Sequence, residues 1–373
     1  MTALLTPTYA LVMDSPRSLP PSDASAHPGS LPVPLPAPVD RPAPVWVAPM
    51  AGGPSTPNLV ISAWEAGHLA QLAAGYKTAE AMAREVREVK VAGVEEFGVN
   101  LFVPNLHRID PQTYDAYAAH LEGDAARYEL PDPLPALRED DDEWEGKIEA
   151  LLADPVPLVS FTFGLPDRKD IAALREAGSL VAQTVTSPAE ARAASAAGVD
   201  VLVVQGSGAG GHSGVWEPHR LPAEAPLPDL VTAVRAEVDL PIVAAGAVTT
   251  REDVRAALAA GAAAVSVGTA ALRAHEAGTN ALHRAALGDP RFTETVLTRA
   301  FTGRPARALV NRFVRDHDAK APVGYPALHH LTKPLRGAAT TAGDADGLNL
   351  WAGTGWRNTR EAPVAEILAA LVP

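Results

Sequence analysis

The sequence contains no cysteine among its 373 residues. Disulfide bonds, and any metal or iron–sulfur centre that needs thiolate ligands, are therefore excluded. Positive charge is also scarce, since 31 lysine and arginine residues stand against 44 aspartate and glutamate residues and leave a formal net charge of −13. The phosphates of nucleic acids and of anionic membranes repel such a chain, so we expect neither as a partner.

Long hydrophobic runs are missing as well. No stretch of about 18 apolar residues occurs, which argues against a membrane-spanning helix. The first 21 residues lack the basic start, the apolar stretch and the small-residue cleavage site of a secretion signal. We therefore expect a protein of the cytoplasm. Its composition, 47% hydrophobic and 20% charged, is typical of a globular protein with a large core.

Proline is concentrated at the beginning of the chain, where the first 44 residues hold 11 of the 35 prolines. Proline removes a backbone donor and fixes φ. Residues 1–43 are therefore predicted to form an extended or disordered arm. A plain tail is a simpler interpretation of this arm than a segment that wraps the body or a partner.

From residue 45 onward, short apolar segments alternate with helical segments. The apolar segments do not alternate with polar residues, which is typical of strands buried on both faces. Eight strands, each followed by a helix or a longer insert, predict a (β/α)8 barrel, with a doubly wound open sheet as the alternative. The clearest strands are expected at 45–50, 97–104, 158–163, 180–185, 201–205, 241–246 and 263–269.

Two parts of the chain depart from this alternation. A largely helical insert is expected at about 110–153, and its acidic run Glu139–Glu143 is interpreted as a solvated surface. From about 276 to 373 helical segments dominate. We therefore predict a barrel over 44–275 and an added, mainly helical region over 276–373 that packs across the barrel mouth.

Glycine is enriched where ligands of a barrel bind, at the carboxyl ends of the strands. The sequence QGSGAGGH ends at His212, and Gly246 and Gly268 follow the last two strands. Without a Cβ, backbone N–H groups can approach an anion, so these two glycines predict a phosphate site; the alternative is that they only make tight turns. A dinucleotide fingerprint is rejected because no helix starts at the third glycine of the first motif.

His212 stands out among the 11 histidines because it follows a strand, in a loop with few side chains to bury it. An imidazole at that place can supply a hydrogen bond, a positive charge or a base near neutral pH. A functional role is therefore favoured over a structural one. The sequence shows no histidine and carboxylate cluster with the spacing of metal ligands, and the adjacent His329 and His330 point to different faces of a helix. No metal is expected.

Several motifs together resemble the nitronate monooxygenase family over about residues 45–360: VAPMAGG, FGVNLFVP, VSFTFGLP, QGSGAGGHSG, PIVAAGAV, VSVGTA and GYPALHHLTKPLRGAA. The resemblance implies a (β/α)8 barrel with an added helical domain and non-covalently bound FMN. It also implies oxidation of alkyl nitronates by O2 to a carbonyl compound and nitrite, with a small-molecule nitronate and O2 as the only partners of a monomer or homodimer.

The resemblance also assigns residues. His212 matches the histidine that faces the substrate. The residues that it implies for the cofactor are Ala48, Met50, Ala51, Gly52, Asn100, Gln205, Gly210, Gly211, Gly246, Ser266, Val267, Gly268 and Thr269. Ser266 departs from the glutamine that is common there, and Ser207, Gly208 and Ser213 also depart from the family pattern, which leaves the substrate open.

Tyr325, His329 and Lys333 are spaced by four residues and are predicted to share one face of a helix that starts near Pro326. Composition alone favours an exposed stripe. The segment is nevertheless similar to the part of the family that closes the substrate pocket with a tyrosine and a lysine. We therefore expect a pocket wall in which Lys333 reaches a charged tail or the nitro oxygens.

Two alternatives remain open. One is an FMN-dependent NAD(P)H reductase of enoyl thioesters or quinones on the same barrel. The other is a flavin-binding module without catalysis, which the presence of Asn100, Gln205 and His212 disfavours.

Overall fold

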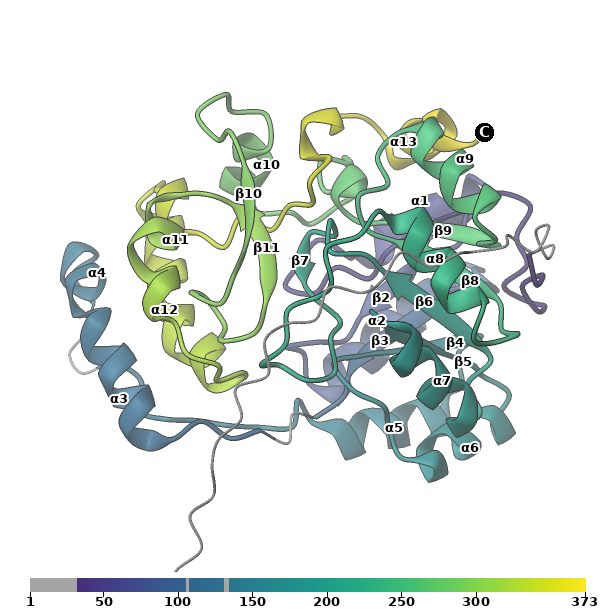
Figure 1. The fold of residues 1–373 in the computed structure, drawn as a ribbon, viewed down its shortest axis with the longest axis horizontal. Coiled ribbons are helices and arrows are strands. Elements are labelled where there is room, and N and C mark those ends of the chain that lie inside the picture. Colours follow the sequence, from purple (N-terminus) through teal and green to yellow (C-terminus); the bar gives the residue numbers. More distant parts are fainter. Residues whose placement is uncertain (1–31, 105–106, 131–133) are drawn as a thin grey trace, which may run out of the picture. The chain divides into compact units, whose positions relative to one another are not determined.

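The computed structural model describes residues 32–104, 107–130 and 134–373. Eight parallel strands form one sheet in the order β1-β9-β8-β6-β5-β4-β3-β2 (Figure 1). Its two ends meet where Val47 forms a parallel bridge to Ala70 and donates its N–H to Leu69 O at 2.8 Å. The predicted barrel is confirmed. Its strands are β1 (Val45–Val47), β2 (Gln71–Ala73), β3 (Gly98–Phe102), β4 (Leu158–Thr162), β5 (Leu180–Val185), β6 (Val201–Gln205), β8 (Ile242–Ala245) and β9 (Ala264–Val267).

Four of the eight described helices that cover the sheet begin at a side-chain N-cap. Thr78 accepts a hydrogen bond from Ala81 N, and Thr250 forms a capping box with Asp253. The last helix comes from the end of the chain and contacts α1 and α9, so the chain leaves the barrel and then returns to it. These helices are α1 (Pro57–Glu65), α2 (Ala79–Val91), α5 (Trp144–Ala153), α6 (Arg168–Glu176), α7 (Pro188–Ala197), α8 (Leu227–Arg235), α9 (Arg251–Ala259) and α13 (Val364–Leu371).

The described end of the proline-rich arm packs against the barrel. Val39 is fully buried in a cluster with Trp46, Leu69 and Leu158. An apolar side chain within the proline-rich stretch therefore joins the core, and the extended or disordered character of the arm stays a prediction. The rest of the predicted arm, residues 1–31, lies outside the described residues.

The added region is mainly helical, as predicted, but it also contains strands that the sequence pattern did not reveal. β10 (Thr295–Thr298) pairs antiparallel with β11 (Ala306–Leu309), and β11 pairs with β7 (Gly211–His212). These strands are too short to show a periodicity. The helical elements of this region are α10 (Ala281–Ala286), α11 (Arg312–His317), α12 (Ala327–Thr341) and the 3-10 turns η2 (Asp318–Lys320), η3 (Ala345–Gly347) and η4 (Trp356–Asn358), whereas the 3-10 turn η1 (Thr269–Ala271) directly follows β9.

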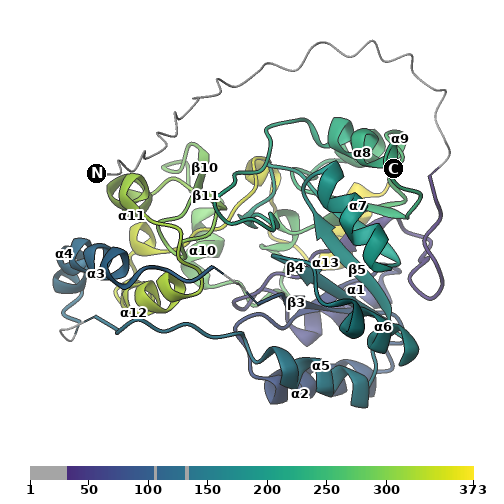
Figure 2. The same cartoon turned by 60° about the horizontal axis from the view of Figure 1, so that its bottom comes forward.

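Part of the helical insert joins this added region. Figures 1 and 2 both show α3 (Pro111–His120) and α4 (Glu122–Arg127) beside α11 and α12. Buried side chains of the two parts, among them Tyr117 and Phe313, form a second core cluster separate from that of the barrel. The predicted boundary at residues 275 and 276 stays a prediction. Within the described ranges, no helix is long and apolar enough to cross a membrane.

Candidate active site

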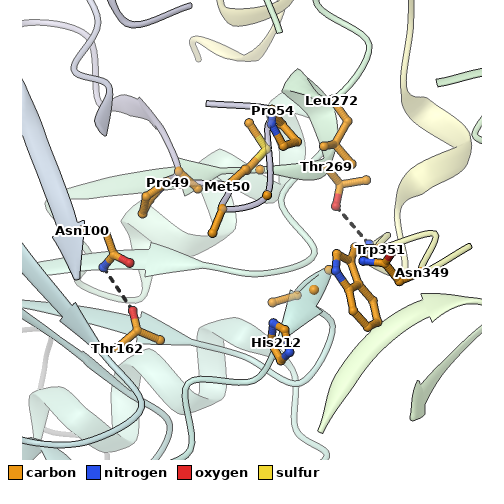
Figure 3. Close-up of a pocket in the computed structure, with 18 of the residues that line it drawn as sticks. Pro49, Met50, Pro54, Asn100, Thr162, His212, Thr269, Leu272, Asn349 and Trp351 are labelled. Atoms are coloured by element: carbon orange, nitrogen blue, oxygen red, sulfur yellow. Dashed lines mark hydrogen bonds between the residues drawn. The ribbon is translucent and has the colours of Figure 1, made fainter. Parts of the chain in front are cut away.

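A cavity of about 460 Å³ opens at the carboxyl ends of the barrel strands, and side chains on or just after all eight strands line it. This volume lies within the range of small-molecule sites, roughly 300–1,000 Å³. In Figure 3, Met50 and Pro54 of the loop after β1 lie on one side of the cavity, with His212 and Trp351 across from them. The cavity is therefore placed where ligands of this fold bind.

The cavity brings together most of the residues predicted to bind a cofactor. The predicted positions that line it are Ala48, Met50, Ala51, Gly52, Asn100, Gln205, Gly210, Gly211, Gly246, Ser266, Gly268 and Thr269. Val267 does not line it, because side chains alternate along β9 and Val267 packs into the core at 1% exposure. The side chain of Val267 therefore faces the core, and a contact of Val267 to the cofactor stays a prediction.

The floor of the cavity is a layer of neutral polar side chains from neighbouring strands. Asn100 Nδ2 donates to Ser160 Oγ at 2.9 Å and to Thr162 Oγ1 at 3.1 Å, the latter bond drawn in Figure 3. Ser160 Oγ in turn donates to Gln71 Oε1 at 2.7 Å. These bonds fix the amide of Asn100 so that its nitrogen is held by the protein, and its oxygen remains to accept a hydrogen bond from a ligand.

Gln205 holds the loop that delivers His212. Its Oε1 accepts a hydrogen bond from Gly214 N at 2.7 Å, and its Nε2 donates to His212 O at 3.3 Å. Both ends of the amide thus bind the backbone of that loop. The contacts that the structure shows for Gln205 therefore serve loop positioning, whereas its contact to a cofactor stays a prediction.

Glycines allow three backbone segments to meet beside the cavity. A Cβ on Gly210 would lie 2.4 Å from Gly353 N, and one on Gly246, whose φ is +100°, would lie 2.9 Å from Gly206 O. Thr269 Oγ1 accepts a hydrogen bond from Gly353 N at 2.9 Å and joins the same meeting point. Close protein packing therefore requires Gly210 and Gly246, and they leave backbone exposed to the cavity.

His212 faces the cavity in a neutral state. Its Nε2 lies 2.9 Å from Thr302 Oγ1, and the rings of Phe163, Tyr325 and Trp351 surround it at centroid distances of 5.3–5.9 Å. Burial, together with the positive charges of Arg304 and Arg336, lowers the pKa of His212 to about 3. Of the three roles that the sequence left open for His212, this lowered pKa favours a hydrogen bond over a positive charge at neutral pH.

Two guanidinium groups, those of the buried Arg304 and of the half-buried Arg336, supply the positive charge instead. Arg304 is fully buried, lies over the Phe163 ring at 4.1 Å and donates to Phe163 O and to Val215 O. Arg336 lines the cavity and donates to His329 O at 2.9 Å. Burial lowers the pKa of each to about 10, so both remain charged at neutral pH. The cavity therefore carries a positive field that suits an anion.

Helix α12 forms the wall on which the substrate residues were predicted. His329 and Lys333 line the cavity, together with Arg336 one turn further along the helix. Because a guanidinium can only donate, His329 Nδ1 is the acceptor of Arg336 Nη2 at 3.3 Å, and the imidazole proton is on Nε2. Burial lowers the pKa of His329, with a further contribution from Arg336.

Tyr325 does not share this helical face. The helix begins at Ala327, after a cis Tyr325–Pro326 bond, so the expected spacing of one turn does not apply to Tyr325. The tyrosine is buried behind the cavity lining, where its ring contacts His212 at 5.9 Å and Phe163 at 5.4 Å. It therefore supports the ring of His212 from behind.

Comparison with known proteins agrees with this site. The family model described as nitronate monooxygenase matches residues 41–373. A nitronate monooxygenase of Pseudomonas aeruginosa is 38% identical over 88% of this chain and 95% of its own length. A probable nitronate monooxygenase of Staphylococcus aureus is 32% identical over 88% of this chain and 93% of its own length. The chain belongs to the nitronate monooxygenase family.

Solved structures extend the comparison. A crystal structure of nitroalkane oxidase from Streptomyces ansochromogenes is 47% identical, with a TM-score of 0.84 over 89% of this chain and 95% of that one. FabK from Thermotoga maritima is 24% identical, with a TM-score of 0.69 over 89% of this chain and 92% of that one. The second likeness shows the fold alone.

In this member of the nitronate monooxygenase family, Asp140, Asp141 and Glu143 of the acidic run are exposed, as predicted, whereas Asp142 is an anchor. Asp142 Oδ1 accepts a hydrogen bond from Tyr76 N at 2.9 Å, and its Oδ2 lies 2.7 Å from the buried Lys147 Nζ. Tyr76, held at a φ of 69°, lines the cavity and stacks on His329 with ring centroids 4.1 Å apart. Asp142 therefore fixes Tyr76 in the wall of the cavity, which a count of charges in the sequence could not reveal.

Most of the cavity residues that the sequence of this family member does not reveal are neither glycines nor charged groups, with Arg336 as the exception. Those that belong to strands lie at the carboxyl end of an apolar run. Their positions could therefore have been predicted from the sequence. The rest come from the added region, and nothing in the local sequence marks them. The missed cavity residues include Gln71, Tyr76, Phe102, Ser160, Thr162, Phe163, Thr184, Asn280, His283, Thr302, Arg336, Asn349 and Trp351.

Proposed function

We propose that this chain oxidises alkyl nitronates with O2 to a carbonyl compound and nitrite, using FMN that is held without a covalent bond. The observation that carries the proposal is a cavity at the strand ends in which a neutral His212 lies beside two guanidinium groups. A nitronate is a small anion, and such a site favours an anion without protonating it.

The residues of the cavity fit FMN. A Cβ on Gly268 would lie 3.6–3.8 Å from Ala48 and Met50, so its absence leaves room between β9 and the loop after β1. The exposed backbone at Gly246 and Gly268 suits a phosphate, and the oxygen of Asn100 suits an N–H of a flat ring. When bound, FMN would supply the one-electron and O2 chemistry that the side chains of this chain cannot supply.

The side chains of this chain would bind and orient the nitronate. Arg336 and Lys333 would attract its negative charge from the α12 side. Among the described residues, His212 Nδ1 has no hydrogen-bond partner, so it is the nitrogen that can contact the nitronate or hold a proton. The aromatic rings of Tyr76, Phe163 and Trp351 would exclude water from the reacting atoms.

An oxygen electrode tests the proposal. The purified protein should be yellow and should release FMN on heat denaturation. With a nitronate it should consume O2 and form nitrite, and the paired neutral nitroalkane shows whether the enzyme also removes the proton. Release of FAD, or a flavin that stays on the chain, would contradict the proposal of non-covalently bound FMN. Absence of O2 uptake with any nitronate would contradict the proposed reaction.

The reductase remains the second candidate because the FabK likeness shares the fold. Anaerobic mixing with NADH separates the two, since fast bleaching of the yellow colour supports a reductase. A chain that takes up no flavin would instead be a module without this chemistry. We further propose that the enzyme works in the cytoplasm as a monomer or homodimer, which sedimentation analysis can test.

A further inference from the structure

Two histidines and a glutamate meet on the surface, away from the residues that line the cavity. His107 belongs to the segment before α3, and Glu217 and His219 belong to the loop between β7 and α8. One ligand atom from each residue lies within 4.8 Å of the other two, with His107 Nε2 at 3.3 Å from Glu217 Oε2. His107 lies more than a hundred positions before Glu217 and His219 in the sequence, so no spacing motif indicates the cluster.

The backbone holds the two residues of the second loop side by side. Arg220 N donates to Glu217 O at 3.1 Å and closes a turn with Pro218 at its second position. His219 N donates to Glu217 Oε1 at 3.1 Å, which leaves Oε2 toward His107. Arg299 fixes the same turn by donating to Pro218 O and His219 O. Carboxylates that bind metal ions are usually oriented in this way by a hydrogen bond from a neighbouring group.

The rings are also arranged for a shared ligand. The imidazoles of His107 and His219 stand nearly perpendicular, at 81°, with centroids 5.7 Å apart. A contrasting cluster lies elsewhere, where His120 and His317 meet beside Asp124. There the carboxylate already accepts the guanidinium of Arg312 at 2.7 Å, so its charge is balanced. Among the residues that the structure describes, the ion-pair contact of Glu217 is the imidazole of His107, which is charged only if it is protonated.

We propose that His107, Glu217 and His219 bind a divalent transition-metal ion such as Zn²⁺ or Ni²⁺. Two imidazole nitrogens and one carboxylate oxygen form a ligand set that favours these ions over Mg²⁺ and Ca²⁺, which prefer oxygen ligands alone. Three protein ligands leave room for water at the remaining positions. The ion would join the segment before α3 to the loop before α8, and so tie together two loops that follow barrel strands.

Calorimetric titration of the tag-free, FMN-loaded enzyme with ZnCl2 and with NiCl2, after removal of metals with EDTA, tests this site. We expect one saturable site per chain. His107→Asn, His219→Asn and Glu217→Gln should each weaken binding by at least about tenfold. The matched control is His275→Asn, since His275 is exposed and lies outside the cluster; it should bind as the wild type does.

The unfolding temperature gives a second readout that does not depend on heats of binding. A ligand that binds the folded chain raises this temperature. Zn²⁺ should therefore stabilise the wild type and His275→Asn, but not the double variant of His107 and His219. The proposal is overturned if the wild type shows no saturable binding, or if the variants of His107, Glu217 and His219 bind the ion as tightly as the wild type.

Discussion

The two sides of the cavity differ in charge. On the barrel side, Asn100, Ser160 and Thr162 are neutral and bind one another across neighbouring strands. On the α12 side, Lys333 and Arg336 are basic, and within the part of the chain that the structure describes Lys333 forms no ion pair. A neutral side with fixed hydrogen bonds suits a cofactor that stays bound, whereas a basic side suits an anion that enters and leaves.

His212 lies between the two sides and belongs electrostatically to the neutral one. The sequence places a histidine at this strand end but cannot show its charge, which depends on burial and on guanidinium groups from residues 304 and 336. The comparison therefore assigns hydrogen bonding to His212 and charge to the arginines. Substitutions on the two sides of the cavity test this division between hydrogen bonding and charge, and their expected effects differ in size.

The largest effect is expected from His212→Asn, which removes the imidazole and leaves the barrel side intact. FMN should remain bound, and turnover of nitronates should fall by one to two powers of ten, since a lost hydrogen bond to a charged group costs roughly 1.5–3 kcal/mol. Oxygen uptake and the flavin spectrum measure the two quantities. His68→Asn is the matched control, because His68 is equally a buried histidine but binds Val45 O outside the cavity lining. Unchanged turnover in His212→Asn would make His212 structural.

Gly210→Ala is expected to disturb the backbone packing on the barrel side of the cavity. The new Cβ would lie 2.4 Å from Gly353 N, so the two backbones must separate. We expect a loss of about 1–3 kcal/mol in the free energy of unfolding, as for other overpacked sites, together with weaker retention of FMN. Urea denaturation and FMN titration measure these effects. Gly123→Ala, where a Cβ meets nothing within 4 Å, should change neither. Full FMN retention by Gly210→Ala would place the cofactor away from this meeting point.

The neutral imidazoles around the cavity should make the fold sensitive to acid. Burial lowers the pKa of His212 to about 3 and that of His283 to about 4, from about 6.5 in the unfolded chain. Between these values the unfolded chain binds a proton that the folded chain does not, so stability falls as the pH is lowered from about 7 toward 4. Each histidine contributes up to about 1.4 kcal/mol per pH unit.

Urea denaturation at pH 7 and pH 5 checks this linkage. His212→Asn and His283→Asn should each lose less stability on acidification than the wild type does. An identical loss in wild type and variants would mean that these imidazoles are protonated in the folded chain.

The smallest effect is expected from Lys333→Met on the basic side. Because Lys333 is exposed, its contribution is that of a surface ion pair, about 0.5–1 kcal/mol, or two- to fivefold in the Michaelis constant. The change should be larger for propionate 3-nitronate than for a simple alkyl nitronate, since only the former has a carboxylate tail. Lys320→Met serves as the control, because Lys320 is also exposed and does not line the cavity. Equal effects on both nitronates would show that Lys333 does not contact the tail.

Local patterns were sufficient to predict the barrel and its strand ends, because buried parallel strands are continuous apolar runs and ligands bind where those runs stop. They could not predict the pairing of His212 on β7 with Ala306 on β11, which depends on contacts between distant segments. For the same reason the sequence does not reveal the role of Asp142 within the acidic run, since Asp142 meets Lys147 and Tyr76 only in the folded chain. Tyr325 does not share the predicted helical face because α12 begins only at Ala327, two residues after the tyrosine.

The protonation state of His212 is the most direct test of the division between hydrogen bonding and charge. It can be measured by the nitrogen chemical shifts of ¹⁵N-labelled histidine in the FMN-loaded enzyme, with His212 assigned by the signal that His212→Asn removes. The lowered pKa predicts that this signal stays at its neutral position from pH 7.5 to about 5. A titration with a midpoint between about 6 and 7, as in an ordinary histidine, would contradict the account and return the positive charge to His212.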